Sequence, residues 1–101
     1  MRQTQAAKLL RIHISDSDRR DGKPLYEAIV ARCRELEIAG ATVFRGLEGF
    51  GDTAELHKPI VIVVVDSEEK LGRLLSDVEP MIDTGLISIT GVQAVRVRHS
   101  A

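Results

Sequence analysis

The residues best suited to bind a ligand lie between positions 40 and 51, in the sequence GATVFRGLEGFG. This stretch holds four of the chain's eight glycines, Gly40, Gly46, Gly49 and Gly51. Glycine adopts backbone conformations that other residues avoid, and it lets the main chain come close to a ligand. A strand that leads into such a loop can present backbone N–H groups to an anion. The pattern therefore indicates an anion-binding loop, and the competing interpretation is a plain flexible connection between two strands.

Two well-known phosphate-binding motifs do not fit this stretch. No Gly-Lys-Ser/Thr sequence follows the glycines, which argues against a Walker-type P-loop. No helical pattern opens after Gly51, which argues against the dinucleotide-binding fingerprint. If this loop binds phosphate, it does so by another arrangement.

A second group of candidate ligands lies near the C-terminus, where Arg96 and Arg98 alternate with valines. Residues two apart in a strand project from the same face, so both guanidinium groups are expected on one side. Such a pair can form charge-assisted hydrogen bonds to phosphate. Two isolated arginines are more typical of a solvated strand edge than of a phosphate site, so the pair indicates a binding site only together with the glycine stretch.

Composition narrows the class of protein. A chain of 101 residues fits one domain, spanning residues 1–101. The net charge of −1 gives no general attraction for nucleic acid or for anionic membranes. The single cysteine, Cys33, excludes an internal disulfide and suits a reducing compartment. Residues 1–8 are polar, unlike a signal peptide, and no apolar run reaches the roughly 20 residues of a membrane span, so we expect a cytoplasmic protein.

The elements that must position these residues follow from hydrophobic periodicity. Two helices are expected, one from Pro24 to about residue 37 and one that begins after Ser67 and is kinked or ended by Pro80. One face of the first helix includes Cys33, which is interpreted as a core residue and not a nucleophile. Strands are expected at residues 9–14, 41–44, 60–65, 86–89 and 92–98, and Gly40 is expected to cap the first helix at its C-terminus. This order is β-α-β-β-α-β with a short extra strand, typical of an α+β ferredoxin-like sandwich.

Residues 60–65, IVIVVV, are apolar at every position. Two helices can cover only one face of a four-stranded sheet, whereas this strand requires burial on both faces. An exposed apolar patch of this kind marks an interface. Self-association through the open face of the sheet is therefore expected.

With the glycine stretch and the C-terminal arginines, the chain resembles the PII signalling proteins and their PII-like relatives. It is most similar to a small PII-related family whose second strand reads GATV-x-RG-x-x-GFG, and the resemblance covers nearly the whole chain. The resemblance implies a homotrimer that binds adenine nucleotides in the clefts between subunits. Thr42 would contact the base, Gly49-Phe50-Gly51 would open the signalling loop, and Thr84-Gly85 would begin the second phosphate loop. Arg96 and Arg98 would reach the phosphates from the neighbouring subunit.

Departures from the PII pattern modify what the resemblance implies. The segment after Gly85 reads LISITGVQAV and lacks the lysine that PII proteins use for phosphate, which favours AMP or ADP, or a cyclic adenine nucleotide, over ATP. The loop of residues 46–58 is short and has no tyrosine to be uridylylated, which makes the nitrogen-signalling cycle doubtful. We expect this loop to be mobile and to act on a protein or a transporter. Bicarbonate is a candidate co-ligand, because some PII-like proteins are linked to inorganic carbon.

Two other classes of function compete with this one. A divalent-metal-binding trimer resembling CutA shares the fold, but its candidate ligands have spacings that match no metal motif. An enzyme would need an acid–base set, and nothing in the spacing of Asp66, Glu48 and His57 indicates one. We therefore expect neither a metal ion nor an enzymatic activity. The candidate metal ligands are His13, His57, His99 and Cys33.

Overall fold

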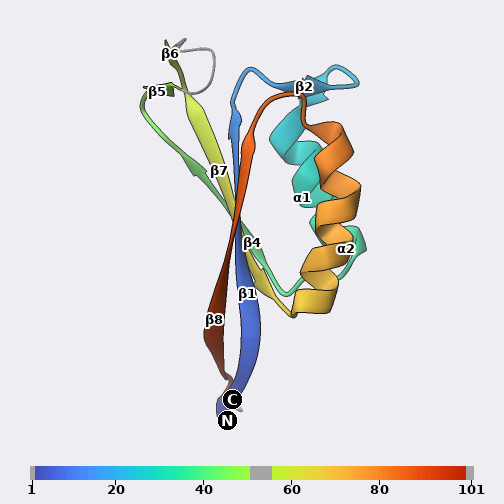
Figure 1. Ribbon diagram of the computed structural model, residues 1–101, viewed down its shortest axis with the longest axis vertical. Helices are drawn as coiled ribbons and strands as arrows, with labels where there is room; N and C mark the ends of the chain where they lie inside the picture. The colour runs from blue at the N-terminus through green and yellow to red at the C-terminus, as the bar shows by residue number, and fades with distance from the viewer. Residues whose placement is uncertain (1, 51–55, 100–101) are drawn as a thin grey trace.

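The computed structural model describes residues 2–50 and 56–99, which form a four-stranded antiparallel sheet with two helices on one side (Figure 1). The strand order is β4-β7-β1-β8, so β7 and β1 are the two central strands. This is the predicted α+β, ferredoxin-like βαββαβ arrangement. Its main elements are β1 (Arg2–Ser15), α1 (Leu25–Glu35), β4 (Ala41–Arg45), β7 (Pro59–Asp66), α2 (Glu68–Val78) and β8 (Leu86–Val97).

Short strands and one 3-10 turn lie in the connections between the main elements. The charged turn after β1 contains the short strand pair β2 (Arg19–Arg20) and β3 (Lys23–Pro24). A second pair, β5 (Gly49–Phe50) and β6 (Leu56–His57), lies between β4 and β7. A 3-10 turn, η1 (Glu79–Met81), follows α2 directly.

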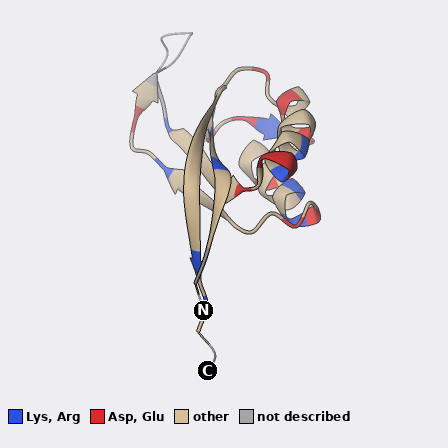
Figure 2. Cartoon of the chain, turned by 60° about the horizontal axis from the view of Figure 1, so that its bottom comes forward, with Lys and Arg blue, Asp and Glu red and all other residues tan. Residues whose placement is uncertain are grey.

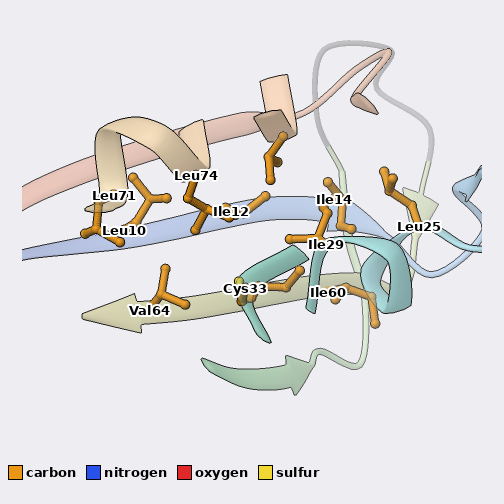
Figure 3. Close-up of a cluster of buried hydrophobic side chains, with 12 residues drawn as sticks. Leu10, Ile12, Ile14, Leu25, Ile29, Cys33, Ile60, Val64, Leu71 and Leu74 are labelled. Carbon is orange, nitrogen blue, oxygen red and sulfur yellow. The ribbon is translucent and has the colours of Figure 1, made fainter. Parts of the chain in front are cut away.

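The hydrophobic core lies between the sheet and the helices (Figure 3). Alternate residues of β1 and β7 face the helices, as period-2 burial requires, and each helix contributes one apolar stripe. Cys33 is buried on the stripe of α1, as predicted. The core residues are Leu10, Ile12, Ile14, Leu25, Ile29, Cys33, Ile60, Ile62, Val64, Leu71, Leu74 and Val78.

The α2 helix begins and ends as predicted. Its N-cap is Ser67, whose side chain accepts a hydrogen bond from the backbone N–H of Lys70 at 3.2 Å. Pro80 ends the regular helix, because proline lacks the N–H that the next turn would need; η1 takes over at Glu79.

The C-terminus of α1 differs from the prediction, because Gly40 does not cap it. The left-handed residue is Glu37, with φ of 57°, and its N–H donates to the carbonyl of Arg34 at 3.1 Å. The N–H of Ile38 donates to the carbonyl of Cys33 at 3.0 Å, which completes a Schellman motif. Ile38 packs against the core, and this apolar contact accompanies the motif although the left-handed position is not a glycine.

The C-terminal part of the chain also differs from the prediction of two short strands. Residues 86–97 form one continuous strand, β8, which passes through Gly91 without a break. The reason is that β1 is longer than the predicted residues 9–14 and pairs with β8 from Arg2↔Val97 to His13↔Leu86. Because β1 pairs with β8 without interruption, the backbone N–H and C=O groups between the two predicted strands also have hydrogen-bonding partners.

Strands β1 and β8 extend beyond the rest of the sheet (Figure 1). The last pair between β1 and β7 is Lys8↔Asp66, so residues 2–7 pair only with residues 92–97. We call this two-stranded extension the β1–β8 arm. It carries Val95 and Val97, which are 51% and 61% exposed. The chain is 46 Å long, and its radius of gyration of 14.7 Å exceeds the roughly 13 Å of a compact domain of this size.

The face of the sheet opposite the helices, here called the open face, is apolar along β7, while the neighbouring strand β1 places Arg11 and His13 on it. Val61, Val63 and Val65 of β7 point to it and are only partly buried. At its sides Phe44 and Leu86 are 55% and 64% exposed. Figure 2 shows the charged residues gathered on the helices and turns, while the strands of the large sheet are mostly uncharged.

Candidate functional site

The glycine stretch begins where β4 ends. The backbone N–H of Gly46 donates to the carbonyl of Pro59 at 2.8 Å, which joins the two sides of the loop at its base. A Cβ atom on Gly46 would overlap the Pro59 ring, so this glycine is required for the close approach of two chain segments. Among the described residues of the stretch none has a positive φ. The close approach, and not a left-handed conformation, is the feature that demands glycine here.

Beyond Gly46 the loop folds back on itself. Gly49 and Phe50 form β5 and pair with His57 and Leu56 of β6, so both sides of the loop are extended and antiparallel. Gly51 lies outside the described residues, as does the central part of the loop that was expected to be mobile.

Thr42 lies in the middle of β4, opposite Val63 of β7. It projects from the open face of the sheet and is exposed. Because β4 is an edge strand, the side chain of Thr42 lies on a part of the sheet that another chain can approach.

Thr84 and Gly85 precede β8 at the same end of the sheet as the base of the glycine loop, but at the opposite edge. Gly85 passes close to β1, and an added Cβ would lie 2.8 Å from the carbonyl oxygen of His13 and 2.9 Å from Cγ2 of Ile82. A side chain at this position would collide with backbone, so glycine is needed for the chain to enter β8.

Arg96 and Arg98 lie far from the other candidate residues of the same chain. Arg96 is on the β1–β8 arm opposite Gln3, Arg98 follows the end of β8, and both are exposed. From Leu86 to Arg96 a strand spans about 34 Å at about 3.4 Å per residue. A single chain therefore does not bring these arginines to Gly49-Phe50 or to Thr84-Gly85.

One cation at the base of the loop was not recognised from the sequence. Arg45 ends β4 immediately before Gly46, with its NH1 3.5 Å from Oδ2 of Asp16 and its guanidinium 5.9 Å from the centre of the Tyr26 ring. The available signal was its place in the GATVFRG motif, where it is followed by a glycine that proves to be sterically required.

The ionisable groups with shifted pKa values are structural. Hydrogen bonds to Asp77 and Glu35 raise the pKa of Arg32, and the Asp77 contact, 2.7 Å from NH2 to Oδ2, ties α1 to α2. Burial raises the pKa of the Cys33 thiol, which opposes formation of a thiolate. These groups connect and fill the helix layer, away from the loop.

The residues that would serve a metal site are dispersed. Cys33 lies in the core, His13 lies on the open face, and His99 follows β8 at the far end of the molecule. Within residues 2–50 and 56–99, no group of three or more His, Cys, Asp or Glu side chains is arranged to hold a metal ion. The same residues contain no helix long and apolar enough to cross a membrane.

Comparison with known proteins assigns the family. Residues 7–94 match the model of DUF190, described as "Uncharacterized ACR, COG1993". A UPF0166 protein of Aquifex aeolicus is 36% identical over 98 residues, which cover 87% of this chain and 92% of that protein. A UPF0166 protein of Methanocaldococcus jannaschii is 34% identical over 94 residues, covering 83% of this chain and 87% of that protein.

Solved structures show the same fold at low sequence identity. CPII from Thiomonas intermedia K12, a nitrogen regulatory PII-like protein bound to ADP, AMP and bicarbonate, aligns with a TM-score of 0.75 and 20% identity, covering 95% of this chain and all of CPII. The divalent cation tolerance protein CutA from Archaeoglobus fulgidus aligns with a TM-score of 0.66 and 17% identity, covering 85% of this chain and 83% of CutA. The chain thus belongs to the DUF190 (UPF0166) family and has the fold of the PII-like proteins.

Proposed function

We propose that this protein is a PII-like regulator that assembles as a homotrimer and binds AMP or ADP in the clefts between subunits. Thr42 contacts the base, the backbone around Gly49-Phe50-Gly51 and Thr84-Gly85 receives the phosphates, and Arg96 and Arg98 neutralise them from the neighbouring subunit. The loop of residues 46–58 relays the bound state to a protein or transporter partner. The protein acts by binding and not by catalysis.

The observation that carries this proposal is the separation of the candidate residues within one chain. Thr84-Gly85 and the glycine loop flank one end of the sheet, while Arg96 lies about 34 Å along β8 from the start of that strand. Thr84, Gly85, Arg96 and Arg98 are exposed, and Gly49 is partly exposed. Contact between copies would bring the arm of one chain to the loops of the next, and a cyclic assembly would repeat that contact at every cleft.

Two features support self-association. The open face of the sheet exposes Phe44 beside the half-buried valines of β7 and exposes Leu86 at the opposite edge, which is unfavourable in water. The arm is a two-stranded ribbon, and such ribbons are marginally stable unless another layer packs on them. Packing against further copies would relieve both features together.

The choice of nucleotide rests on charge. The segment between Gly85 and Arg96 contains no lysine, so fewer cations are available for a third phosphate than in the PII pattern. CPII binds ADP, AMP and bicarbonate, and its fold matches this chain over almost its whole length. Bicarbonate is therefore included as a co-ligand to be tested with the nucleotides.

The alternative function is that of a CutA-like divalent-metal-binding trimer, which the likeness to CutA structures favours. Its candidate ligands His13, Cys33 and His99 lie in three separate parts of the described chain, and burial further disfavours the Cys33 thiolate. The side chain of His57 lies outside what the structure describes. The dispersed ligands make the nucleotide proposal the stronger of the two.

Isothermal titration of the purified protein against AMP, ADP, ATP, cyclic AMP and cyclic di-AMP, each with and without bicarbonate, tests the proposal. Saturable binding of AMP or ADP, tighter than that of ATP, is the expected result. Titration with Cu²⁺ and Zn²⁺ tests the alternative in the same instrument. Binding of metal and of no nucleotide would replace the proposed function with the CutA-like one.

A further inference from the structure

The base of the glycine loop is closed by one backbone contact between its two sides and by one backbone contact with the turn that follows β1. The N–H of Gly46 donates to the carbonyl of Pro59 at 2.8 Å, across the base of the loop. The N–H of Asp16, in the turn after β1, donates to the carbonyl of Lys58 at 3.0 Å. Asp16 is thus bound through its backbone to the residue that precedes β7.

The side chain of Asp16 reaches the other side of the same loop. Its Oδ2 lies 3.5 Å from NH1 of Arg45, the residue immediately before Gly46. Arg45 also lies over the ring of Tyr26 on α1, at 5.9 Å from its centre, a distance typical of a cation–π contact. Asp16 therefore contacts both sides of the loop at its base, through its side chain to Arg45 and through its backbone N–H to Lys58.

The ion pair between Arg45 and Asp16 is weak, so another anion can compete with Asp16 for Arg45. The Arg45 side chain is 54% exposed and that of Asp16 is 29% exposed, and the 3.5 Å separation is longer than a charge-assisted hydrogen bond. Partly exposed ion pairs of this kind contribute little to stability because water screens them. A phosphate group carries more charge than a carboxylate and offers three acceptor oxygens, so it competes well for a guanidinium.

We propose that Arg45 is a phosphate ligand of the nucleotide site and that Asp16 is its internal competitor, so that binding moves the guanidinium from Asp16 to the bound phosphate. This inference rests on the proposed function. The segment after Gly85 has no lysine to bind phosphate, and Arg45 at the base of the loop would supply the missing positive charge. When Arg45 leaves Asp16, the contact between the β1 turn and the start of the loop is lost. Nucleotide binding is thereby coupled to the conformation of residues 46–50.

The competition predicts effects of opposite sign for the two partners. Titration of ADP into the intact protein is expected to show at least about tenfold weaker binding for Arg45→Met, the loss of one charge-assisted contact to phosphate. Asp16→Asn removes the competing charge and keeps the size of the side chain, and it is expected to tighten ADP binding by about two- to fivefold. Arg45→Lys keeps the charge but loses the planar fork, and its affinity is expected to fall between those of the wild type and Arg45→Met.

Matched controls remove the same charges from the exposed surface of α2, where Arg73→Met and Glu69→Gln are expected to leave ADP affinity unchanged. A structural role for the pair would lower affinity in both Arg45→Met and Asp16→Asn, because both variants open the base of the loop. Parallel losses, or unchanged affinity in both, overturn the inference. If Arg45→Met fails to fold, as judged by circular dichroism, the increase expected for Asp16→Asn still decides.

The proposed function fails in a different and recognisable way. A wild-type protein that binds none of AMP, ADP and ATP rejects both proposals at once. A wild-type protein that binds ADP with no gain in Asp16→Asn rejects only the role of the Arg45–Asp16 pair.

Discussion

At the scale of single residues, Gly46 shows that the base of the loop can form only where a side chain is absent. Its N–H holds the carbonyl of Pro59, and its α-carbon faces the Pro59 ring with no room for a Cβ. The proline ring cannot rotate away as a long side chain can. Any larger residue at position 46 must therefore push β4 and β7 apart at the point where the loop begins.

Gly46→Ala is expected to destabilise the protein by about 1–3 kcal/mol, the usual effect of inserting a methyl group where there is no space. The matched control is Gly72→Ala on α2, where an added Cβ meets no atom within 4 Å. That change is expected to stabilise the protein by up to about 1 kcal/mol, because alanine favours a helix over glycine. Thermal unfolding followed by circular dichroism measures both, and equal midpoints for the two variants would contradict the steric argument.

The C-terminal arginines carry the second prediction at this scale. Charge-assisted hydrogen bonds contribute roughly 1.5–3 kcal/mol each, so Arg98→Ala is expected to weaken ADP binding by about ten- to a hundredfold. Arg96→Ala is expected to act in the same direction. Light scattering should show an unchanged oligomer, because the two arginines are proposed to bind the nucleotide and not to hold the subunits together. Unchanged ADP affinity in both single variants would remove these residues from the site.

At the scale of elements, strand β8 and the glycine loop have different roles. β8 is bonded to β1 along its whole length and forms a rigid connection between Thr84-Gly85 and the arm. Beyond the hydrogen bonds at its base, the described part of the loop is held together by the two-residue strands β5 and β6. Short pairs of this kind open at low free energy, so the loop is the element most readily changed by a ligand.

Hydrogen exchange tests whether the loop is the output element. Amides of residues 47–50 and 56–58 are expected to exchange fast in the free protein and to become protected in saturating ADP. Amides in the middle of β1, such as that of Ile12, serve as the internal reference, because the strand is paired on both sides there. Equal exchange of the loop amides with and without ADP would exclude this loop from signalling.

At the scale of the whole molecule, the open face and the β1–β8 arm are the surfaces that no helix in the described part of the chain covers. The face exposes Phe44 and Leu86, and the arm exposes Val95 and Val97 with no helix covering them. Both surfaces are continuous with β8, which is an edge strand of twelve residues. A long exposed edge favours association with another chain.

We expect size-exclusion chromatography with light scattering to give three times the chain mass of 11.1 kDa at micromolar concentration. Val63→Lys places a positive charge on the open face directly across from Arg11 and is expected to dissociate the trimer, because two like charges without a counter-ion are costly to bury. Val64→Asp, the next residue, faces the core and is expected to unfold the chain instead. Ser76→Asp on the exposed side of α2 is the control and should change neither property. A wild-type protein that is monomeric and stably folded would contradict the proposed assembly.

The sequence by itself determined the layers of this protein. Alternating apolar residues in β1, the uniform IVIVVV run of β7 and the helical stripes around Ile29 and Leu74 specify two helices over one face of a sheet. These signals are local, because a strand or a helix must show its own period to bury one face. The ferredoxin-like prediction, the Ser67 cap and the buried Cys33 all depend on such local signals, and all are confirmed.

Only the tertiary structure decided features that depend on distant partners. Residues 2–7 have no strong alternation, and they form a strand because β8 pairs with them, which is also why Gly91 does not break β8. Glu37 replaces Gly40 at the end of α1 because Ile38 packs against the core. The meeting of Arg45 with Asp16, and the distance of Arg96 from the glycine loop, arise from contacts and strand lengths that link residues far apart in sequence. No local pattern encodes such contacts, because the free energy that selects them is gained only when the sheet has formed.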